Sequence, residues 1–405
     1  MITLAEARAI VLDALMPVGM AQVPLDDVHG RTLAKSLIAQ RTQPPFSSSA
    51  MDGFAVRGGD LGDGPTSLQI IGESAAGHPS DLVVGEGEAA RISTGAPMPN
   101  GADQVVMRED ATCEGDVVTV DCPANSGRHV RAAGVDFETG DELAEAGRVI
   151  DALVLSLAVS SGVQDVEVRN VPHVALLSTG DELVEAGEVL GDGQIINSNG
   201  PGLAAMVREL GGEPIALGII PDDREAVRNA LTGEQVKAAD LLITIGGASV
   251  GDHDHLRAVF AEEGGTLLFE KIAVKPGKPT WFGHMGDTPV LGLPGNPVSA
   301  LVIARLLLVP ALAQLLGQGP ETQATYARAR LGTDLPANGP REIFIRANLE
   351  TNPAGRQTVS PLTNQDSSAL SALVRADCLI RRAGDAPYLS AGDHVEIVHL
   401  RSSKT

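Results

Sequence analysis

The residues best suited to do chemistry lie between positions 241 and 297, where glycine-rich turns alternate with lysines. Gly246 and Gly247 follow an apolar run, which is typical of a buried strand that ends where the backbone closely approaches something else. A second apolar run precedes Gly295 and Asn296, and Asn296 can cap the following helix so that free N–H groups face an anion. Three lysines between the turns carry charge that neutralises phosphates: Lys271, Lys275 and Lys278.

Each of these features also has a purely structural interpretation. A strand followed by two glycines is common in turns that bind nothing, and lysines often lie on a solvated face. Pro276 and Pro279 favour a ligand site, because they stiffen the lysine loop and rigid loops between core strands often position functional groups. Neither a Walker lysine motif nor a Gly-x-Gly-x-x-Gly turn follows these strands, which argues against the common nucleotide sites.

Acidic residues are expected at the same sheet edge. Glu182 follows a strand-like run, and a carboxylate beside a phosphate site is costly unless a cation lies between them. Magnesium is the natural candidate, since it binds oxygen ligands and bridges to phosphate. The segment 252–255 reads Asp-His-Asp-His and could be a transition-metal cluster, but alternating residues of one short loop rarely all face inward.

Strand and helix patterns alternate from residue 171 to about 318, which predicts a right-handed, mostly parallel, doubly wound α/β sheet. Short β-like runs in a glycine-rich stretch predict a small β domain over 46–139. Alternating runs return after 318 and predict a C-terminal β domain over 319–405. Helices are predicted at the N-terminus, with Thr3 and Glu6 as a capping box, and after the cap Asp151.

The composition is that of an ordinary globular protein of two to four domains. Its 52 acidic residues exceed its 30 basic residues by 22, which argues against a general nucleic-acid or anionic-membrane surface. An anionic ligand therefore needs a local basic pocket.

Cysteine and hydropathy patterns point to the cytoplasm. The three cysteines form no C-x-x-C pair, so neither a disulfide framework nor a thiolate metal site is expected. The N-terminus carries charges within its apolar pattern and is no signal peptide. Arg305 and Pro310 interrupt the apolar run 301–316, so no uncharged apolar run reaches membrane-spanning length and no membrane span is predicted.

Five motifs occur in order along the chain: PPFSSSAMDGFAV, RISTGAPMP, GGASVGDHD, KPGKP and GLPGNPVSA. Together they closely resemble the molybdopterin molybdenumtransferase family of the MoeA type, which is also similar to the C-terminal domain of gephyrin. The resemblance covers nearly the whole chain. It implies that residues 1–45 and 140–170 form one elongated N-terminal domain into which the β domain 46–139 is inserted, and that 171–318 bind molybdopterin.

The resemblance also implies roles for individual residues. Those assigned to catalysis are Asp52, Thr94, Asp136, Glu182 and Asp254. Those assigned to the substrate are Asp222, Gly246, Gly247, Ser249, Lys271, Lys275, Lys278, Gly295, Asn296, Arg346 and Ser367. Taken alone, Asp52, Thr94 and Asp136 would be ordinary turn or cap residues. Where the family usually shows Gln-Gly-Ser-Gly, this chain has Gln365-Asp366-Ser367-Ser368, and the added Asp366 carboxylate could repel an anionic substrate.

The implied reaction joins adenylylated molybdopterin with molybdate and gives molybdenum cofactor and AMP. Mg²⁺ is the expected cofactor, with Glu182 and Asp222 as candidate ligands. The acids of the β domain are far in sequence from the α/β domain, so a homodimer with shared active sites is expected. Transient contact with other molybdenum-cofactor biosynthesis proteins is also expected. No nucleic-acid or membrane partner is expected.

Two other functions stay open at this point. A molybdopterin adenylyltransferase has a fold that resembles residues 171–318, although the extra domains with Asp52 and Thr94 favour metal insertion. A scaffold that merely retains the fold is the other alternative, against which the retained acids and lysines argue. The sequence does not distinguish molybdate from tungstate.

Overall fold

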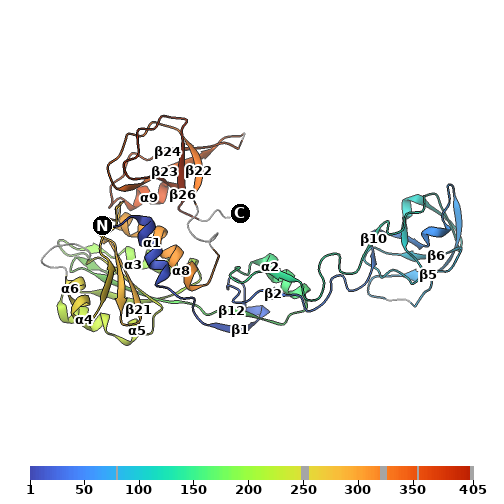
Figure 1. Ribbon diagram of the computed structural model, residues 1–405, viewed down its shortest axis with the longest axis horizontal. Helices are drawn as coiled ribbons and strands as arrows, with labels where there is room; N and C mark the ends of the chain where they lie inside the picture. Colours follow the sequence, from blue (N-terminus) through green and yellow to red (C-terminus); the bar gives the residue numbers. More distant parts are fainter. Residues whose placement is uncertain (79–80, 248–254, 320–325, 354, 402–405) are drawn as a thin grey trace.

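The computed structural model describes residues 1–78, 81–247, 255–319, 326–353 and 355–401. The molecule is elongated, with two domains packed at one end, a small β domain at the other and a narrow middle part between them (Figure 1). The expected site residues Ser249 and Asp254 lie outside the described residues, as do Asp252 and His253 of the possible transition-metal cluster.

The α/β domain contains the predicted sheet, with four parallel strands followed by two antiparallel ones. In spatial order the strands are β16 (Glu213–Ile220), β13 (His173–Thr179), β17 (Leu241–Ile245), β21 (Thr288–Leu293), β20 (Trp281–Met285) and β18 (Thr266–Phe269). Side chains along each parallel strand alternate between two cores, because successive residues point to opposite faces. In β13, for example, Val174 and Leu176 belong to one core, and Ala175 and Leu177 belong to the other.

Helices cover both faces of this sheet, which confirms the doubly wound prediction. One face packs against α1 (Leu4–Asp13), α3 (Asn199–Glu209), α7 (Pro297–Ile303) and α8 (Val309–Leu315). The other packs against α4 (Arg224–Leu231), α5 (Glu234–Lys237) and α6 (His255–Glu262). The capping box of α1 forms as predicted between Thr3 and Glu6. However, α1 packs with α8 in the α/β core, whereas the resemblance implies that residues 1–45 belong to the elongated domain.

Arg305 and Pro310 interrupt the uncharged apolar run 301–316 in the sequence, but they do not end the helix. A continuous helix runs from Pro297 to Leu315, with a π turn at Ala304–Leu308 that contains Arg305 and ends shortly before Pro310. By length and composition alone this helix could span a membrane, but 83% of its apolar window is buried inside the protein. It is therefore the central core helix of the α/β domain, and Arg305 donates a hydrogen bond to the His399 carbonyl oxygen at 2.9 Å.

The middle part joins segments that are far apart in sequence. Strand β1 (Met20–Pro24) pairs antiparallel with β12 (Asp165–Arg169), and β2 (Leu37–Ile38) pairs with β11 (Glu142–Ala144). Helix α2 (Ala152–Ser160) packs there and is capped as predicted, since the Asp151 carboxylate accepts the Leu153 and Val154 N–H groups. The chain therefore leaves the middle part, forms the β domain and returns.

The β domain at the far end is a six-stranded sheet with its own small core. In spatial order its strands are β7 (Gln104–Met107), β4 (Gly53–Val56), β6 (Glu88–Ile92), β5 (Thr66–Ser74), β9 (Val117–Val120) and β8 (Ala111–Glu114). A short pair of strands, β3 (Ser48–Ser49) and β10 (Val130–Arg131), lies where the chain enters and leaves. Two chain segments connect this domain to the middle part, so it projects from the rest of the protein (Figure 1). We call it the arm.

The C-terminal domain is a small barrel. Pairing of β23 with β25 closes the ring formed by β22 (Ala327–Leu331), β23 (Glu342–Thr351), β24 (Gln357–Pro361), β25 (Cys378–Arg382) and β26 (His394–His399). The short strand β19 (Val274–Lys275) from the lysine loop adds to β23, and α9 (Leu370–Arg375) packs against α7. The barrel therefore contacts the lysine loop and helix α7 directly.

Candidate active site

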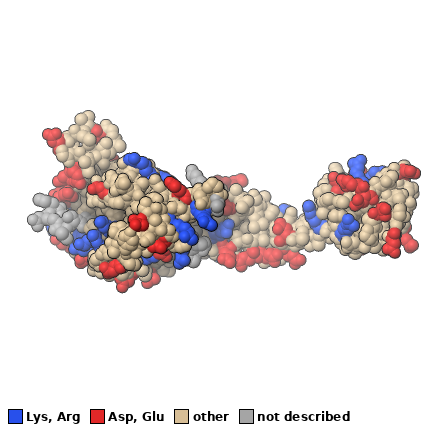
Figure 2. All heavy atoms as spheres, turned by 90° about the horizontal axis from the view of Figure 1, so that it is seen from above, with Lys and Arg blue, Asp and Glu red and all other residues tan. Residues whose placement is uncertain are grey.

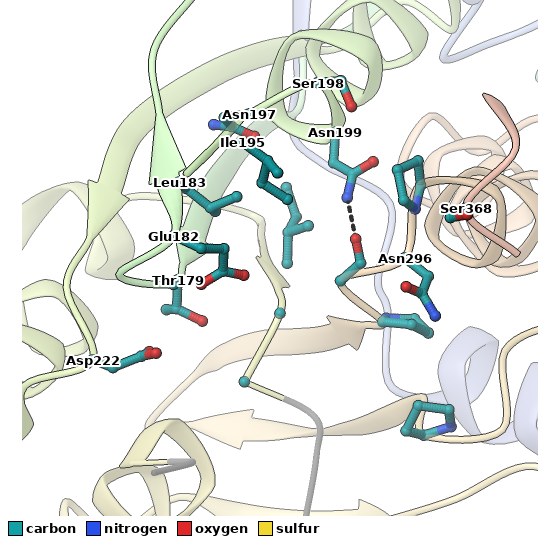
Figure 3. A pocket seen from close by; sticks show the side chains of 18 of the residues that line it. Thr179, Glu182, Leu183, Ile195, Asn197, Ser198, Asn199, Asp222, Asn296 and Ser368 are labelled. Carbon is teal, nitrogen blue, oxygen red and sulfur yellow. Dashed lines mark hydrogen bonds between the residues drawn. The ribbon is translucent and has the colours of Figure 1, made fainter. Parts of the chain in front are cut away.

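A cavity of about 1000 Å³ opens at the carboxyl ends of the parallel strands β13, β17 and β21 (Figure 3). This is the edge at which open α/β sheets usually bind ligands. Its lining comes from the strand ends, the β14 (Leu183–Val184) and β15 (Ile195–Ile196) segment, the start of α3 and the lysine loop. Eight sequence-predicted site residues line it: Glu182, Asp222, Gly246, Gly247, Lys271, Lys278, Gly295 and Asn296.

The two glycine turns lie against each other at the base of this cavity. Gly246 has φ of +89°, and a Cβ atom there would lie 2.6 Å from the carbonyl oxygen of Thr179. A Cβ atom on Gly295 would lie 3.6 Å from the Gly246 Cα. Glycine therefore lets the ends of three strands come together and leaves exposed backbone facing the cavity.

Two of the three predicted lysines line the cavity. The N–H of Ile272 donates to the Lys278 carbonyl oxygen at 3.1 Å, which holds the Lys271 and Lys278 segments side by side. Gly277 has φ of +118° and packs so closely on Ile303 of α7 that a Cβ atom would collide with it. Lys275 lies in β19, pairs with Ile343 of the barrel, and is not among the lining residues.

Glu182 and Asp222 place negative charge on the wall of the cavity that lies away from Asn296 and Ser368 (Figure 3). The pKa of Asp222 is raised, first because the carboxyl group is partly desolvated and then because Asp181 and Glu182 repel its charged form. Within the described ranges, no group of three or more His, Cys, Asp or Glu residues is arranged to hold a metal ion. The wall therefore offers a few carboxylates to a cation rather than a complete set of protein ligands.

The predicted helix cap at Asn296 is right in position and wrong in chemistry. Asn296 occupies the N-cap of α7, but its side chain makes no capping hydrogen bond. Instead, its amide nitrogen donates to the Ser367 Oγ at 3.2 Å, and the N–H of Val298 donates to the Ser367 carbonyl oxygen at 3.1 Å. The barrel therefore supplies the cap of α7, and the next residue, Ser368, lines the cavity.

Arg346 holds this barrel loop from beneath rather than facing the cavity. Its side chain is buried, and its guanidinium donates to the carbonyl oxygens of Asn364 and Asp366 at 3.1 and 2.9 Å. The carboxylate of Asp366 accepts hydrogen bonds from the Ser368 hydroxyl and N–H, which lowers the pKa of Asp366. The extra acid that distinguishes this loop is thus engaged within the loop itself.

Asp52 and Thr94 meet on the projecting arm, in the β domain. The N–H of Thr94 donates to the Asp52 carboxylate at 2.6 Å, and this bond lowers the pKa of Asp52, with a smaller contribution from the charge of Arg108. A Cβ atom on Gly53 would collide with the Val106 carbonyl oxygen, so Asp52 is followed by a required glycine. The arm places this pair far from the cavity of the same chain (Figure 1).

Asp136 lies on the connection between the arm and the middle part. Its N–H donates to the Gln43 carbonyl oxygen at 3.1 Å, and its side chain is exposed. One chain therefore brings Asp52 and Thr94 together, and Glu182 and Asp222 together, without joining the two groups.

Sequence reasoning missed the polar residues that β13 and the start of α3 contribute to the cavity. They are Thr179, Asn197, Ser198, Asn199 and, from the barrel, Ser368. The run Asn197-Ser198-Asn199-Gly200 ahead of an apolar helix was the available signal, since such residues favour helix starts and leave polar groups exposed.

The protein surface is mostly acidic, whereas the cavity contains two lysines. Asp and Glu side chains line an edge of the middle part and dot the arm, in keeping with the net charge of −22 (Figure 2). Lys271 and Lys278 are thus a local basic feature on an acidic protein. Charges farther away than roughly 8 Å are largely screened at physiological salt, so the acidic surface does not cancel them.

Family models cover nearly the whole chain. Residues 2–162 match the MoeA N-terminal region (domain I and II), residues 175–314 match a probable molybdopterin binding domain, and residues 328–400 match the MoeA C-terminal region (domain IV). These three matches follow the order of the domains in the structure.

Individual relatives extend the match to full length. A molybdopterin molybdenumtransferase from Haemophilus influenzae is 37% identical, with 98% of each chain covered. One from Staphylococcus aureus (strain COL) is 32% identical over 94% of this chain and 91% of its own. The crystal structure of a molybdopterin biosynthesis MoeA protein from Pyrococcus horikosii matches with a TM-score of 0.84 at 32% identity, covering 99% of both chains. The chain belongs to the molybdopterin molybdenumtransferase family of the MoeA type.

Proposed function

We propose that this protein transfers molybdenum from molybdate to adenylylated molybdopterin, giving molybdenum cofactor and AMP. The observation that carries the proposal is the cavity, in which two lysines and two glycine turns meet at the carboxyl ends of parallel strands. That arrangement suits a ligand with several phosphate charges. Membership of the family over the full chain supplies the identity of the ligand.

In this proposal the cavity binds and orients the phosphates. Lys271 and Lys278 offset their charge. The Gly246 N–H is already donated to the Leu293 carbonyl oxygen, so the phosphates are proposed to lie beside the two lysines. Lys275, Arg346 and Ser367 are proposed to act from the loop and strand that border the cavity, with Arg346 holding the loop that carries Ser367. Release of AMP requires an oxygen nucleophile at phosphorus, which bound molybdate can supply.

Magnesium fits the acidic wall. Mg²⁺ is commonly held by one or two carboxylates together with substrate phosphates. Glu182 and Asp222 supply such carboxylates, and the raised pKa of Asp222 marks a local excess of negative charge that a cation would relieve. Bound there, the ion would offset charge between the wall and the phosphates.

Asp52 and Thr94 are proposed to act on molybdate. The hydrogen bond from Thr94 holds the Asp52 carboxylate in place and keeps it ionised, so that it can orient the oxyanion or accept a proton. Since the arm keeps this pair away from its own chain's cavity, we propose a homodimer in which each arm completes the partner's site. Asp136, on the connection, is proposed to serve the same shared site.

The remaining expectations stay part of this proposal. The protein is proposed to act in the cytoplasm, with transient contacts to other proteins of molybdenum-cofactor biosynthesis. A separate molybdopterin adenylyltransferase activity is not favoured, because the relatives named molybdopterin molybdenumtransferase match the arm and the barrel as well as the α/β domain.

A reconstituted reaction tests the proposal. Purified protein would be incubated with adenylylated molybdopterin, Mg²⁺ and molybdate while AMP and molybdenum cofactor are quantified. The expected result is equimolar AMP and cofactor, with little AMP when molybdate is omitted. A parallel assay supplies ATP and molybdopterin instead. Formation of adenylylated molybdopterin there, with no molybdate-dependent AMP release in the first assay, would identify an adenylyltransferase.

A further inference from the structure

Two buried polar atoms on the cavity wall have no hydrogen-bond partner among the described residues. They are the hydroxyl oxygen of Thr179 and the side-chain oxygen of Asn199. Thr179 is 5% exposed and Asn199 is 8% exposed, so bulk water does not readily satisfy them. Native proteins pair nearly all such atoms, and an unpaired one is costly. A partner entering through the cavity would remove that cost.

The two atoms belong to one continuous patch. A Cβ atom on Gly246 would lie 3.2 Å from the Thr179 Oγ. A Cβ atom on Gly295 would lie 3.6 Å from the Gly246 Cα. The Asn199 amide nitrogen in turn donates to the Gly295 carbonyl oxygen at 2.7 Å (Figure 3). The glycines thus clear space between Thr179 and Asn199, and a side chain at Gly246 would crowd the Thr179 hydroxyl.

The orientation of the Asn199 amide defines what the patch accepts. Its nitrogen must face the Gly295 carbonyl oxygen, so its oxygen is the free atom. That oxygen only accepts hydrogen bonds, and an unprotonated phosphate oxygen has no proton to offer and would be repelled. Thr179 can donate or accept. Phosphates therefore belong beside Lys271 and Lys278, and a group with N–H donors belongs beside Thr179 and Asn199.

Apolar side chains complete this end of the cavity. Leu183 and Ile195 also line it, and they offer a surface for the face of a flat ring (Figure 3). Small-molecule sites commonly combine such apolar walls with a few fixed polar atoms that set orientation.

We infer that the Thr179 hydroxyl and the Asn199 side-chain oxygen recognise the N–H edge of a heteroaromatic ring of the substrate. The inference rests on the proposed function, in which the substrate carries two rings with N–H groups, an adenine and a pterin. Thr179 and Asn199 determine specificity here and take no part in bond cleavage.

The test is Thr179→Val, which replaces the hydroxyl by a methyl group of similar size. The free protein loses no described hydrogen bond, so its melting temperature should not fall. Isothermal titration with AMP and, separately, with a pterin monophosphate should show about 3- to 10-fold weaker binding of at least one, as expected for one lost hydrogen bond.

Thr244→Val is the matched control. The Thr244 hydroxyl is also buried and without a partner in the described chain, and it lies on β17 beside β13, but it does not line the cavity. The same chemical change there should leave both affinities unaltered. Asn199→Ala should weaken binding too, and it should lower the melting temperature because the bond to Gly295 is lost.

The outcomes separate the two rings and the two proposals. Weaker binding of AMP alone places adenine at the patch, and weaker binding of the pterin monophosphate alone places the pterin there. Unchanged affinity of Thr179→Val for both probes, with the unsubstituted protein binding them, overturns this inference and leaves the proposed function intact. Failure of the unsubstituted protein to bind either probe overturns both.

Discussion

The cavity of the α/β domain and the Asp52 pair on the arm are built in opposite ways. The cavity sits at the ends of buried strands, and its Asp222 has a raised pKa because neighbouring acids repel it. Asp52 lies on the surface of a small sheet, and its pKa is lowered by the N–H of Thr94. The first region gathers lysines and carboxylates around a cavity, whereas the second presents an exposed carboxylate that a backbone hydrogen bond holds in place. In the proposed function, the reaction uses both regions.

Asp52→Asn should produce the largest effect. If Asp52 orients molybdate or accepts a proton, turnover should fall by about 100-fold or more, since positioned acid–base groups contribute on that scale. Affinity for AMP should not change, because the cavity lies elsewhere. Rates of AMP release and titrations with AMP on the same preparation measure the two effects.

Asp151→Asn is the control for that substitution. Asp151 is likewise exposed, accepts backbone N–H groups and has a lowered pKa, but it caps α2 in the middle part. Its substitution should leave turnover per folded molecule normal. A folded Asp52→Asn protein with normal AMP release would remove Asp52 from the mechanism and leave it as a turn residue.

Lys278→Ala tests whether the cavity, rather than the arm, binds the phosphates. Loss of a charge-assisted contact to phosphate should weaken AMP binding by about 10- to 100-fold, from the usual strength of hydrogen bonds to charged groups. Lys275→Ala should have a smaller effect, because Lys275 lies on the strand that joins the barrel and not on the cavity wall. Equal losses at both positions, measured by calorimetry, would place the phosphates nearer the barrel than proposed.

Asp222→Asn should have the smallest effect, on stability. The folded chain holds this proton more tightly than the unfolded chain does, because the folded pKa is raised. The ionised carboxyl group therefore costs stability above its folded pKa, and the cost disappears as the pH falls through that pKa to the ordinary value of about 3.9.

The substitution should raise the melting temperature at pH 7 by about 1 to 3 °C, a modest figure for a partly exposed group. The difference from the unsubstituted protein should vanish by about pH 3.5. Mg²⁺ should also stabilise the unsubstituted protein more than the variant. A lower melting temperature for the variant at pH 7 would show that the charge of Asp222 is already compensated.

Features governed by local sequence were predictable. The apolar run Leu241–Ile245 is a buried strand, and the caps at Thr3 and Asp151 form, because each depends on residues close in sequence. The predicted cap at Asn296 failed because its amide bonds Ser367, 71 residues away, on a barrel that the sequence did not place beside α7.

In the candidate site, too, residues set by local sequence were predicted and residues set by tertiary packing were not. Glycines and lysines that follow predicted strands were found, since parallel strand ends converge on one edge. Thr179 and Asn199 were not found, because their significance depends on burial and on a contact with Gly295 that tertiary packing creates. Asp52 and Thr94 were paired only by the fold, across 42 residues.

In the proposed homodimer, Asp52 of one chain and Glu182 of its partner chain serve one reaction. Two heterodimers, each purified with different tags on its two chains, test it directly. In the first, one chain carries Asp52→Asn and its partner carries Glu182→Gln. In the second, an unsubstituted chain is paired with a chain that carries both substitutions.

Sharing of the site predicts opposite behaviour for the two. The first heterodimer retains one site with both acids and should show about half the normal rate of AMP release, as the two-fold symmetry of a dimer requires. The second has one damaged acid in each site and should be nearly inactive. If instead the second heterodimer is half-active and the first is inactive, both acids belong to a single chain, and the account of an arm completing its partner's cavity is wrong.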